Sequence, residues 1–310
     1  MKFRRVAVAV VAVMLGSGWA WAQARPQPKP SIAPATTQKA FQEMQKTLGL
    51  VPRMFQVLPE NAVPGAWRDF QTVELSNKTA LSPKYKELIG LAVAAQVPCD
   101  YCTYFHTEAA KANGATSREL NEALTIGALV RKWSTVLNGV QLDVATFRKE
   151  TQQMLSAAPK ELGRGGAPPE VTDAQSAYKD MELTWGMVPS FMRAYPQAGV
   201  AGAWQVMKDF EMNPNTALPQ KYKELIGLGV AAQIPCDYCT YFHTEGAKKQ
   251  GATPQEISEA VAVASHTRFW STILNGAQVD ETAFRKETNQ ILQHQKRQAA
   301  TPGKPSTGQR

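Results

Sequence analysis

The sequence predicts an all-α protein with two tandem helical domains of one fold, and three observations support this class. The segment Glu87 to His106 recurs almost letter for letter as Glu224 to His243, and weaker similarity extends to both sides at the same offset. Thr116 and Thr253 each begin a Thr-x-x-Glu capping box, which predicts a helix start. No segment shows the alternation of apolar and polar residues that a β-strand requires.

The N-terminus has the features of a signal peptide. Basic residues precede a short apolar run, Val6 to Met14, and Ala20-Trp21-Ala22 offers an Ala-x-Ala cleavage motif. We expect residues 1–22 to be removed on export. This predicts a periplasmic or secreted protein without stable membrane association after cleavage.

Composition divides the rest of the chain. Residues 23–38 are rich in Pro, Gln, Ala and Thr and are expected to be a disordered lead-in. The first domain is expected at 39–155 and the second at 174–295. Between them, 156–173 contains several Pro and Gly residues and reads as a linker. The basic, polar residues 296–310 are expected to be a disordered tail.

The repeated motif is expected to lie on two consecutive helices of each repeat. Glu87 lies in an Ala-rich apolar segment that we expect to be a buried helix, and a carboxylate there needs a partner, for which His106 is the obvious candidate. Pro98 suits the first turn of the following helix. Cys99, Cys102 and His106 then share one helix face, because residues three and four apart are neighbours. The second repeat has the same spacing in Glu224, Cys236, Cys239 and His243.

The remaining elements of each repeat are also helical. Asn113-Gly114 suits a helix C-terminus, and the helix that begins after Thr116 continues to about Leu137. A final amphipathic helix is expected from about Asp143 in the first repeat and Asp280 in the second. Outside the motif, the tyrosines are expected to wall the site and the tryptophans to serve as core or interface anchors: Tyr101, Tyr104, Tyr238 and Tyr241, and Trp67, Trp133, Trp204 and Trp270. His266 aligns with Leu129 and His294 lies near the tail, so neither is expected in a doubled site.

All four cysteines of the chain lie in the two Cys-x-x-Cys pairs, and three interpretations are open. A structural disulfide suits an exported protein, but a bridge over two intervening residues closes almost no loop and stabilises little. A zinc site could use both thiols with His106 and Glu87, although structural zinc usually takes thiol pairs from two segments. A redox-active dithiol beside an acid/base pair explains why Glu and His recur at fixed positions with the cysteines. We favour this third interpretation.

The pattern Glu-x11-Cys-x2-Cys-x3-His resembles the signature of the alkylhydroperoxidase D-like branch of the carboxymuconolactone decarboxylase superfamily. The similarity covers both repeats, from about Phe41 to Phe147 and from Tyr178 to Phe284. It implies an all-α fold, assembly into a homo-oligomer, and reduction of hydroperoxides with electrons from a thiol reductant. The lactone decarboxylases of the superfamily lack the dithiol, so a lyase is the lesser family alternative.

The resemblance also implies roles for the motif residues. Cys102 and Cys239 would attack the peroxide and Cys99 and Cys236 would resolve the product to a disulfide, while Glu87 with His106, and Glu224 with His243, would relay protons. One departure is Tyr101 and Tyr238, which stand where well-known members have a histidine of the relay. A tyrosine titrates too high to serve as a base at neutral pH.

Charge and composition limit the partners. The net charge of +8 includes the signal peptide and tail, and no basic stripe with interleaved aromatic residues predicts nucleic-acid binding. No cofactor or resident metal is expected. Two fused copies predict a trimer of tandem domains. A metal- or disulfide-stabilised helical binding module is the alternative outside enzymes.

Overall fold

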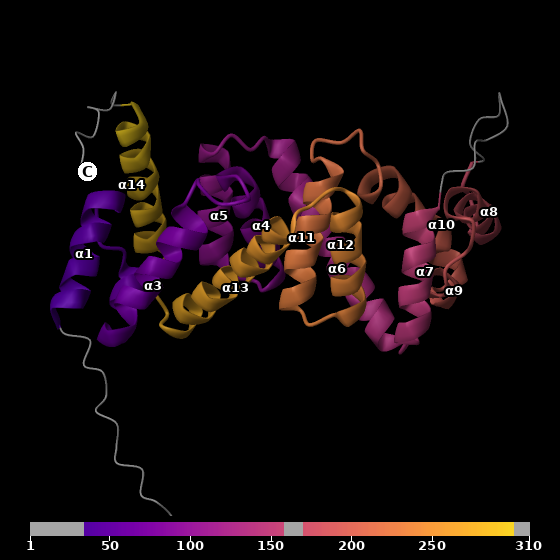
Figure 1. Cartoon of the computed structure of the whole chain (residues 1–310), viewed down its shortest axis with the longest axis horizontal. Coiled ribbons are helices and arrows are strands. Elements are labelled where there is room, and N and C mark those ends of the chain that lie inside the picture. The colour runs from indigo at the N-terminus through magenta and orange to yellow at the C-terminus, as the bar shows by residue number, and fades with distance from the viewer. Residues whose placement is uncertain (1–33, 158–169, 301–310) are drawn as a thin grey trace, which may run out of the picture.

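The computed structural model describes residues 34–157 and 170–300, and these ranges contain helices and turns but no β-strand (Figure 1). The predicted all-α class is therefore confirmed. The expected signal peptide, most of the expected linker and the end of the tail lie outside the described residues. No helix in the described part is long and apolar enough to cross a membrane.

Each repeat contributes the same series of helices, including a short 3-10 helix and a π-helical turn. The first repeat comprises α1 (Pro34–Leu48), α2 (Arg53–Gln56), η1 (Glu60–Ala62), α3 (Val63–Phe70), the π-helical η2 (Gln71–Leu75), α4 (Pro83–Gln96), α5 (Asp100–Ala112), α6 (Ser117–Gly139) and α7 (Val144–Ser156). The second comprises α8 (Ala174–Trp185), α9 (Ser190–Ala194), η3 (Gln197–Gly199), α10 (Val200–Val206), the π-helical η4 (Met207–Glu211), α11 (Gln220–Gln233), α12 (Asp237–Lys249), α13 (Pro254–Gly276) and α14 (Glu281–Ala300).

Side-chain caps determine where several helices begin. Thr116 and Thr253 form the predicted capping boxes with Glu119 and Glu256, so the first backbone N–H groups of α6 and α13 are satisfied. Asp143 accepts a hydrogen bond from the backbone N–H of Thr146 at 2.7 Å and caps α7. These caps confirm the helix starts inferred from the sequence.

Two helix ends differ from the sequence analysis. The helix α1 begins at Pro34, inside the lead-in that was expected to be disordered as far as residue 38, and α14 continues to Ala300, beyond the expected end at 295. Packing explains the earlier start of α1: Thr37 in the lead-in is buried and donates to the carbonyl oxygen of Glu60 at 2.9 Å. Ala40, Met44 and Leu48 continue from it as a buried stripe in the same apolar cluster as residues of α3 and α14. A stripe at four-residue spacing stabilises a helix through tertiary contacts even where local composition is polar.

The two repeats are interlocked. The central helices α4 and α11 pack on each other, α6 of the first repeat packs on α11, and α13 of the second packs on α4. Figure 1 shows α14 beside α1 at one end of the elongated molecule, and α7 beside α8–α10 at the other. Tyr85 and Tyr222, which are equivalent residues, stack at the centre with ring centroids 3.2 Å apart. Each end of the molecule is therefore built from both repeats.

A buried lysine in each repeat strengthens this arrangement. Lys86 is fully buried, and its Nζ donates to the carbonyl oxygens of Val73 and Ser76 at 2.7 and 2.9 Å and lies 3.0 Å from Glu259 Oε1 of the second repeat. Lys223 binds the carbonyls of Phe210 and Asn213 in the same way. Each lysine thus holds the π-helical turn that precedes α4 or α11.

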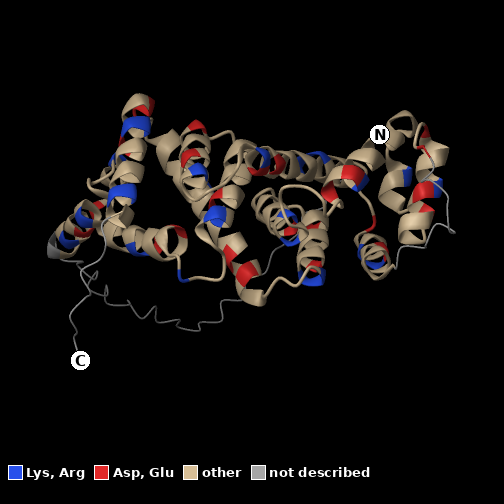
Figure 2. Cartoon of the chain, turned by 90° about the horizontal axis from the view of Figure 1, so that it is seen from above, with Lys and Arg blue, Asp and Glu red and all other residues tan. Residues whose placement is uncertain are grey.

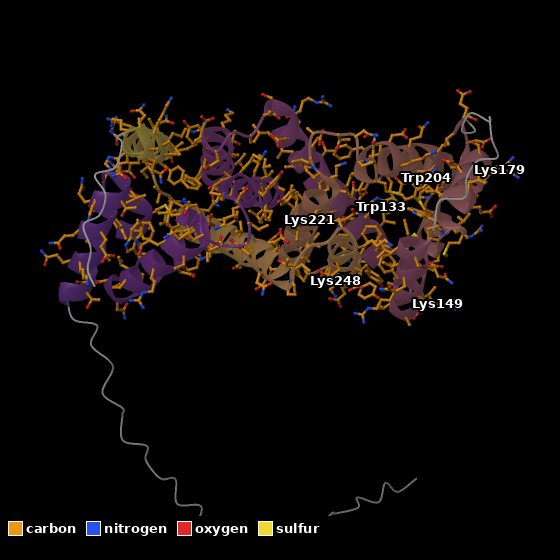
Figure 3. The ribbon with its side chains drawn as sticks, turned by 45° about the horizontal axis from the view of Figure 1, so that its top comes forward. Trp133, Lys149, Lys179, Trp204, Lys221 and Lys248 are labelled. Carbon is orange, nitrogen blue, oxygen red and sulfur yellow. A yellow bond between two sulfur atoms is a disulfide. The ribbon has the colours of Figure 1, made fainter. Side chains whose placement is uncertain are left out.

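The described tryptophans lie in the interior, as the sequence indicated, and most charged side chains lie at the surface. Trp67 and Trp204 are buried, and Figure 3 shows Trp133 and Trp204 among interior side chains while Lys149 and Lys179 lie at the outer edge. Figure 2 shows acidic and basic residues interspersed along the ribbon.

Candidate functional site

The structure brings the four predicted residues of each motif together. In the first repeat Glu87 comes from α4, Cys102 and His106 come from α5, and Cys99 is the residue that caps α5; all are buried. The second repeat repeats this arrangement on α11 and α12 with Glu224, Cys236, Cys239 and His243. One expectation is corrected: Pro98 precedes the cap and lies outside the helix. The Sγ of Cys99, as the N-cap, accepts the backbone N–H of Cys102 at 3.2 Å.

The predicted carboxylate–imidazole pair is present in both repeats. Nδ1 of His106 lies 2.7 Å from Oε2 of Glu87, and Nδ1 of His243 lies 2.8 Å from Oε2 of Glu224. Burial raises the pKa of Glu87, against the opposing hydrogen bond and charge of His106. Burial lowers the pKa of His106, but the hydrogen bond and charge of Glu87 outweigh it and the net shift is upward. Both shifts favour states in which the pair retains a proton, so one proton is held between the two groups.

A glycine makes room for each imidazole. A Cβ at Gly227 would lie 2.5 Å from Cε1 of His243, and a Cβ at Gly90 would be at least as close to the ring of His106. No real side chain fits at such a distance. The glycines that interrupt the apolar helices α4 and α11 therefore let the ring approach the helix backbone and reach its glutamate.

The two thiols of each motif differ in their surroundings. The pairs are disulfide-bonded, Cys99 to Cys102 and Cys236 to Cys239. Cys102 and Cys239 line a cavity, whereas Cys99 and Cys236 are fully buried behind them. An external molecule therefore meets the second cysteine of the motif first.

Both cavities are narrow and apolar, with a volume of about 30 Å³ each. The lining comes from both repeats: Cys102, His106, Phe70, Thr267, Trp270 and Phe284 are among those at the first site. The second cavity contains the equivalent mixture, including Cys239, His243, Met207, Val130, Trp133 and Phe147. A larger groove of about 780 Å³ adjoins the first cavity and shares Met54, Phe70, Glu74, Phe105 and Phe284 with it. Each site is complete only when the other repeat is packed against it.

The tyrosines of the motif do not wall these cavities, contrary to expectation. The hydroxyl of Tyr101 donates to the carbonyl oxygen of Val279 at 2.6 Å, and that of Tyr238 donates to Leu142 at 2.5 Å. Both acceptors lie in the turn that precedes the last helix of the opposite repeat. The hydroxyl at this position therefore holds the two repeats together, and its proton is committed to a backbone carbonyl.

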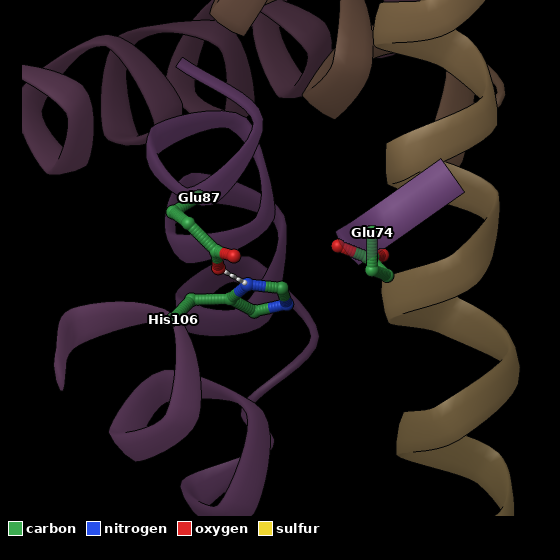
Figure 4. Close-up of side chains that lie close together, drawn as sticks. All are labelled: Glu74, Glu87 and His106. Carbon is green, nitrogen blue, oxygen red and sulfur yellow. Dashed lines mark hydrogen bonds and ion pairs between the residues drawn. The ribbon is translucent and has the colours of Figure 1, made fainter. Parts of the chain in front are cut away.

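The sequence analysis missed a second buried carboxylate in each site. Glu74 lies on the π-helical turn η2 and lines the first cavity, and Glu211 holds the equivalent place in the second. Figure 4 shows Glu74 across from the Glu87–His106 pair. One oxygen of each, Oε2, is buried without a hydrogen-bond partner. Burial raises the pKa of Glu211 to about 7, although the charge of His243 opposes the shift. Glu74 and Glu211 occupy equivalent positions in the two repeats, and this repetition could have identified them from the sequence.

His266 was also missed, because the equivalent position of the first repeat is Leu129 and the residue is not repeated. Its Nε2 lies 2.7 Å from Oδ2 of Asp69 and its Nδ1 lies 3.4 Å from Oε1 of Glu74. The next residue, Thr267, places Oγ1 3.2 Å from Nε2 of His106. Both residues belong to α13 of the second repeat but serve the first site.

Among the described residues, one group of side chains lies close enough together to hold a metal ion. Ligand atoms of Glu74, Glu87 and His106 lie within 4.8 Å of one another. However, both imidazole nitrogens of His106 already contact partners, Glu87 and Thr267, and the adjacent thiols are bonded to each other. A metal would have to displace these contacts, so the cluster is better suited to holding protons.

Both repeats match the same family of known proteins. The chain matches the model of the carboxymuconolactone decarboxylase family twice, over residues 61–143 and 198–282, together more than half its length. A protein of Paracoccus denitrificans called "Uncharacterized protein 4 in cox locus" is 40% identical over 52 residues, which is 17% of this chain and 47% of that protein. An uncharacterized protein of Cupriavidus necator is 40% identical over 47 residues, 15% of this chain and 42% of that protein. The chain thus spans about half the length of these curated relatives.

One solved structure was also matched. It is the crystal structure of a candidate gamma-carboxymuconolactone decarboxylase subunit from Burkholderia xenovorans, with a TM-score of 0.48 and 20% sequence identity. The match covers 88% of this chain and 100% of that one.

Proposed function

Because the chain belongs to the carboxymuconolactone decarboxylase family, we propose that it is a thiol-dependent peroxidase with one dithiol site per repeat. One observation carries the proposal: in each repeat a dithiol, a buried Glu–His pair and a small apolar cavity meet at one point. The volume of about 30 Å³ favours hydrogen peroxide or a hydroperoxide with a small organic group.

The first half-reaction starts from the reduced dithiol. The Glu87–His106 pair takes the thiol proton of Cys102, and the thiolate attacks one peroxide oxygen. The O–O bond breaks as the S–O bond forms, and the leaving oxygen takes the proton to become an alcohol or water. Cys99 then attacks the sulfur of the sulfenic acid, releasing water and forming the disulfide. The peroxide gains two electrons and the two thiols lose two. Cys239, Cys236, Glu224 and His243 do the same in the second repeat.

The position of Cys99 favours reduction of the disulfide. An external thiol reaches the sulfur of Cys102 from the cavity, so Cys99 is the leaving thiolate. A thiolate there accepts the N–H of Cys102 and sits at a helix N-terminus, where negative charge is stabilised. A second thiol of the reductant then releases the protein, supplying the two electrons. The groove beside the first cavity offers an approach for this reductant.

A double substitution tests the proposal. C102S with C239S should abolish peroxide-driven loss of thiols in reduced protein, while C102S or C239S alone should leave one site, and about half the disulfide yield. The single variants are controls for folding, since each must retain its intact site. Full peroxide consumption by the double variant would contradict the assigned roles. A lactone decarboxylase, the lesser family alternative, would instead keep its lyase activity without either cysteine.

We also propose export and assembly into a trimer of tandem chains, as the sequence led us to expect. Light scattering on the mature protein at micromolar concentration tests the assembly. A monomer would eliminate the trimer.

A further inference from the structure

The two sites are alike at the dithiol but differ around it. Three corresponding positions carry different chemistry, with the first-site residue given first: Asp69 and Val206, His266 and Leu129, Thr267 and Val130. Every polar group in this set therefore belongs to the first site. The second site has apolar side chains at the same places.

At the first site these residues form a continuous series from the surface inwards. The side chain of Asp69 is 64% exposed, and it contacts His266, whose side chain is 9% exposed. His266 faces Glu74, which is 3% exposed, and Glu74 lies across from His106. The carboxylate of Asp69 thus reaches solvent, and ligand atoms of Glu74 lie within 4.8 Å of those of Glu87 and His106.

The contacts in the series differ in how directly they can pass a proton. The 2.7 Å contact of Asp69 with Nε2 of His266 is a full hydrogen bond. The 3.4 Å separation of Nδ1 from Glu74 must shorten by about 0.5 Å to become one. An imidazole can take a proton on one nitrogen and release it from the other, which suits His266 to the middle position.

The charges around His266 support this role. It faces Asp69 on α3, Glu74 on η2 and His106 on α5. Burial lowers the pKa of His266, but the hydrogen bond and charge of Glu74, followed by those of Asp69, raise it overall. Contact with these two carboxyl groups favours the protonated form of His266, which places a balancing positive charge beside them.

The second site lacks this balance. Glu211 faces Glu224, His243 and Lys223, and Leu129 and Val206 supply no group between it and solvent. A proton leaving the second site therefore has no side-chain route equivalent to the first.

We propose that Asp69, His266 and Glu74 form a proton path between solvent and the first dithiol site, so that the two sites of one chain react with different pH dependence. This rests on the proposed dithiol chemistry, in which a thiol proton leaves before the peroxide is attacked and a proton returns to the leaving oxygen. The path supplies the first site with an exchangeable proton. The second site must hold its proton within the buried Glu211, Glu224 and His243 group.

The test uses reduced protein with one site at a time. C236S with C239S leaves the first dithiol, and C99S with C102S leaves the second. Thiolate formation is followed by ultraviolet absorbance across pH, which needs no peroxide. We expect H266L to raise the titration midpoint of the first site, because leucine removes an imidazole whose positive charge faces Glu74 and His106 beside the dithiol. The second site should not move.

Further variants guard against misfolding and separate the possible failures. D69N changes an exposed side chain and should shift the first site in the same direction, whereas D209N, an exposed carboxylate near the second site, should shift neither. L129H with V206D should lower the midpoint of the second site. Equal midpoints for the two sites, unaffected by H266L and D69N, would overturn the proposal. If the midpoints respond as expected but peroxide oxidises neither dithiol, the different pH dependence of the two sites stands and the peroxidase function is wrong.

Discussion

Replacement of Glu211 with glutamine should stabilise the protein at alkaline pH and leave it almost unchanged at acidic pH. Glu211 is buried, one of its oxygens has no partner, and its pKa is raised from 4.5 to about 7. Because the folded-state value is the higher one, the unfolded chain loses this proton first as the pH rises. The free energy of unfolding therefore falls between about pH 4.5 and about pH 7 and is level above that window.

The size of the effect follows from the shift. A rise from 4.5 to about 7, at about 1.4 kcal/mol per unit, costs the folded state about 3 kcal/mol above pH 7. Glutamine keeps the shape and cannot ionise. Since about 1 kcal/mol moves the melting temperature of a chain this large by roughly 2–3 °C, E211Q should melt roughly 6–9 °C higher at about pH 8.

Thermal unfolding of wild type and E211Q at about pH 5 and about pH 8 measures this difference. The control is E74Q at the equivalent position. Glu74 faces His266, so its loss leaves that imidazole with Asp69 alone and should not stabilise the protein. An E211Q melting temperature that differs from wild type by the same amount at both pH values would refute the linkage argument.

Three further substitutions probe the architecture. G90A should displace His106, separate it from Glu87 and slow thiol oxidation at the first site by at least about tenfold. G65A is the control, because a Cβ at Gly65 meets no atom and should leave the rate unchanged. Stopped thiol assays compare the two variants. Y101F removes one hydrogen bond between the repeats and should cost about 1 kcal/mol in denaturant unfolding while dithiol oxidation continues. K86M leaves the carbonyls of Val73 and Ser76 without their lysine donor and removes the ion pair with the half-buried Glu259, so it should destabilise the fold by about 3 kcal/mol. A melting temperature equal to wild type would show that the Lys86–Glu259 ion pair is dispensable.

Much of the fold could be predicted from local chemistry. Capping boxes at Thr116 and Thr253 depend on residues three apart, and a buried Glu87 needs a partner one helix away, so both follow from the sequence. The start of α1 at Pro34 could not be predicted, because the composition there is polar and the helix is stabilised by packing on the distant α3 and α14.

The site was harder to predict because it crosses the repeats. The repeated residues indicate the motif but not His266, which has no counterpart histidine and contacts the first site only. Tyr101 was expected in the cavity wall, although its side chain contacts the opposite repeat. A sequence repeat shows which residues are equivalent. It does not show which helices of one repeat pack against the other.

The interlocking of the repeats affects how the two copies can diverge. His266 and Thr267 are encoded in the second copy and act on the first motif, while Val130 and Trp133 are encoded in the first copy and face the second motif. A substitution in one repeat therefore changes the surroundings of the dithiol in the other repeat. The duplicated motifs can remain almost identical while the residues around the two dithiols differ. The differences lie in the helices that each repeat contributes to the site of the other.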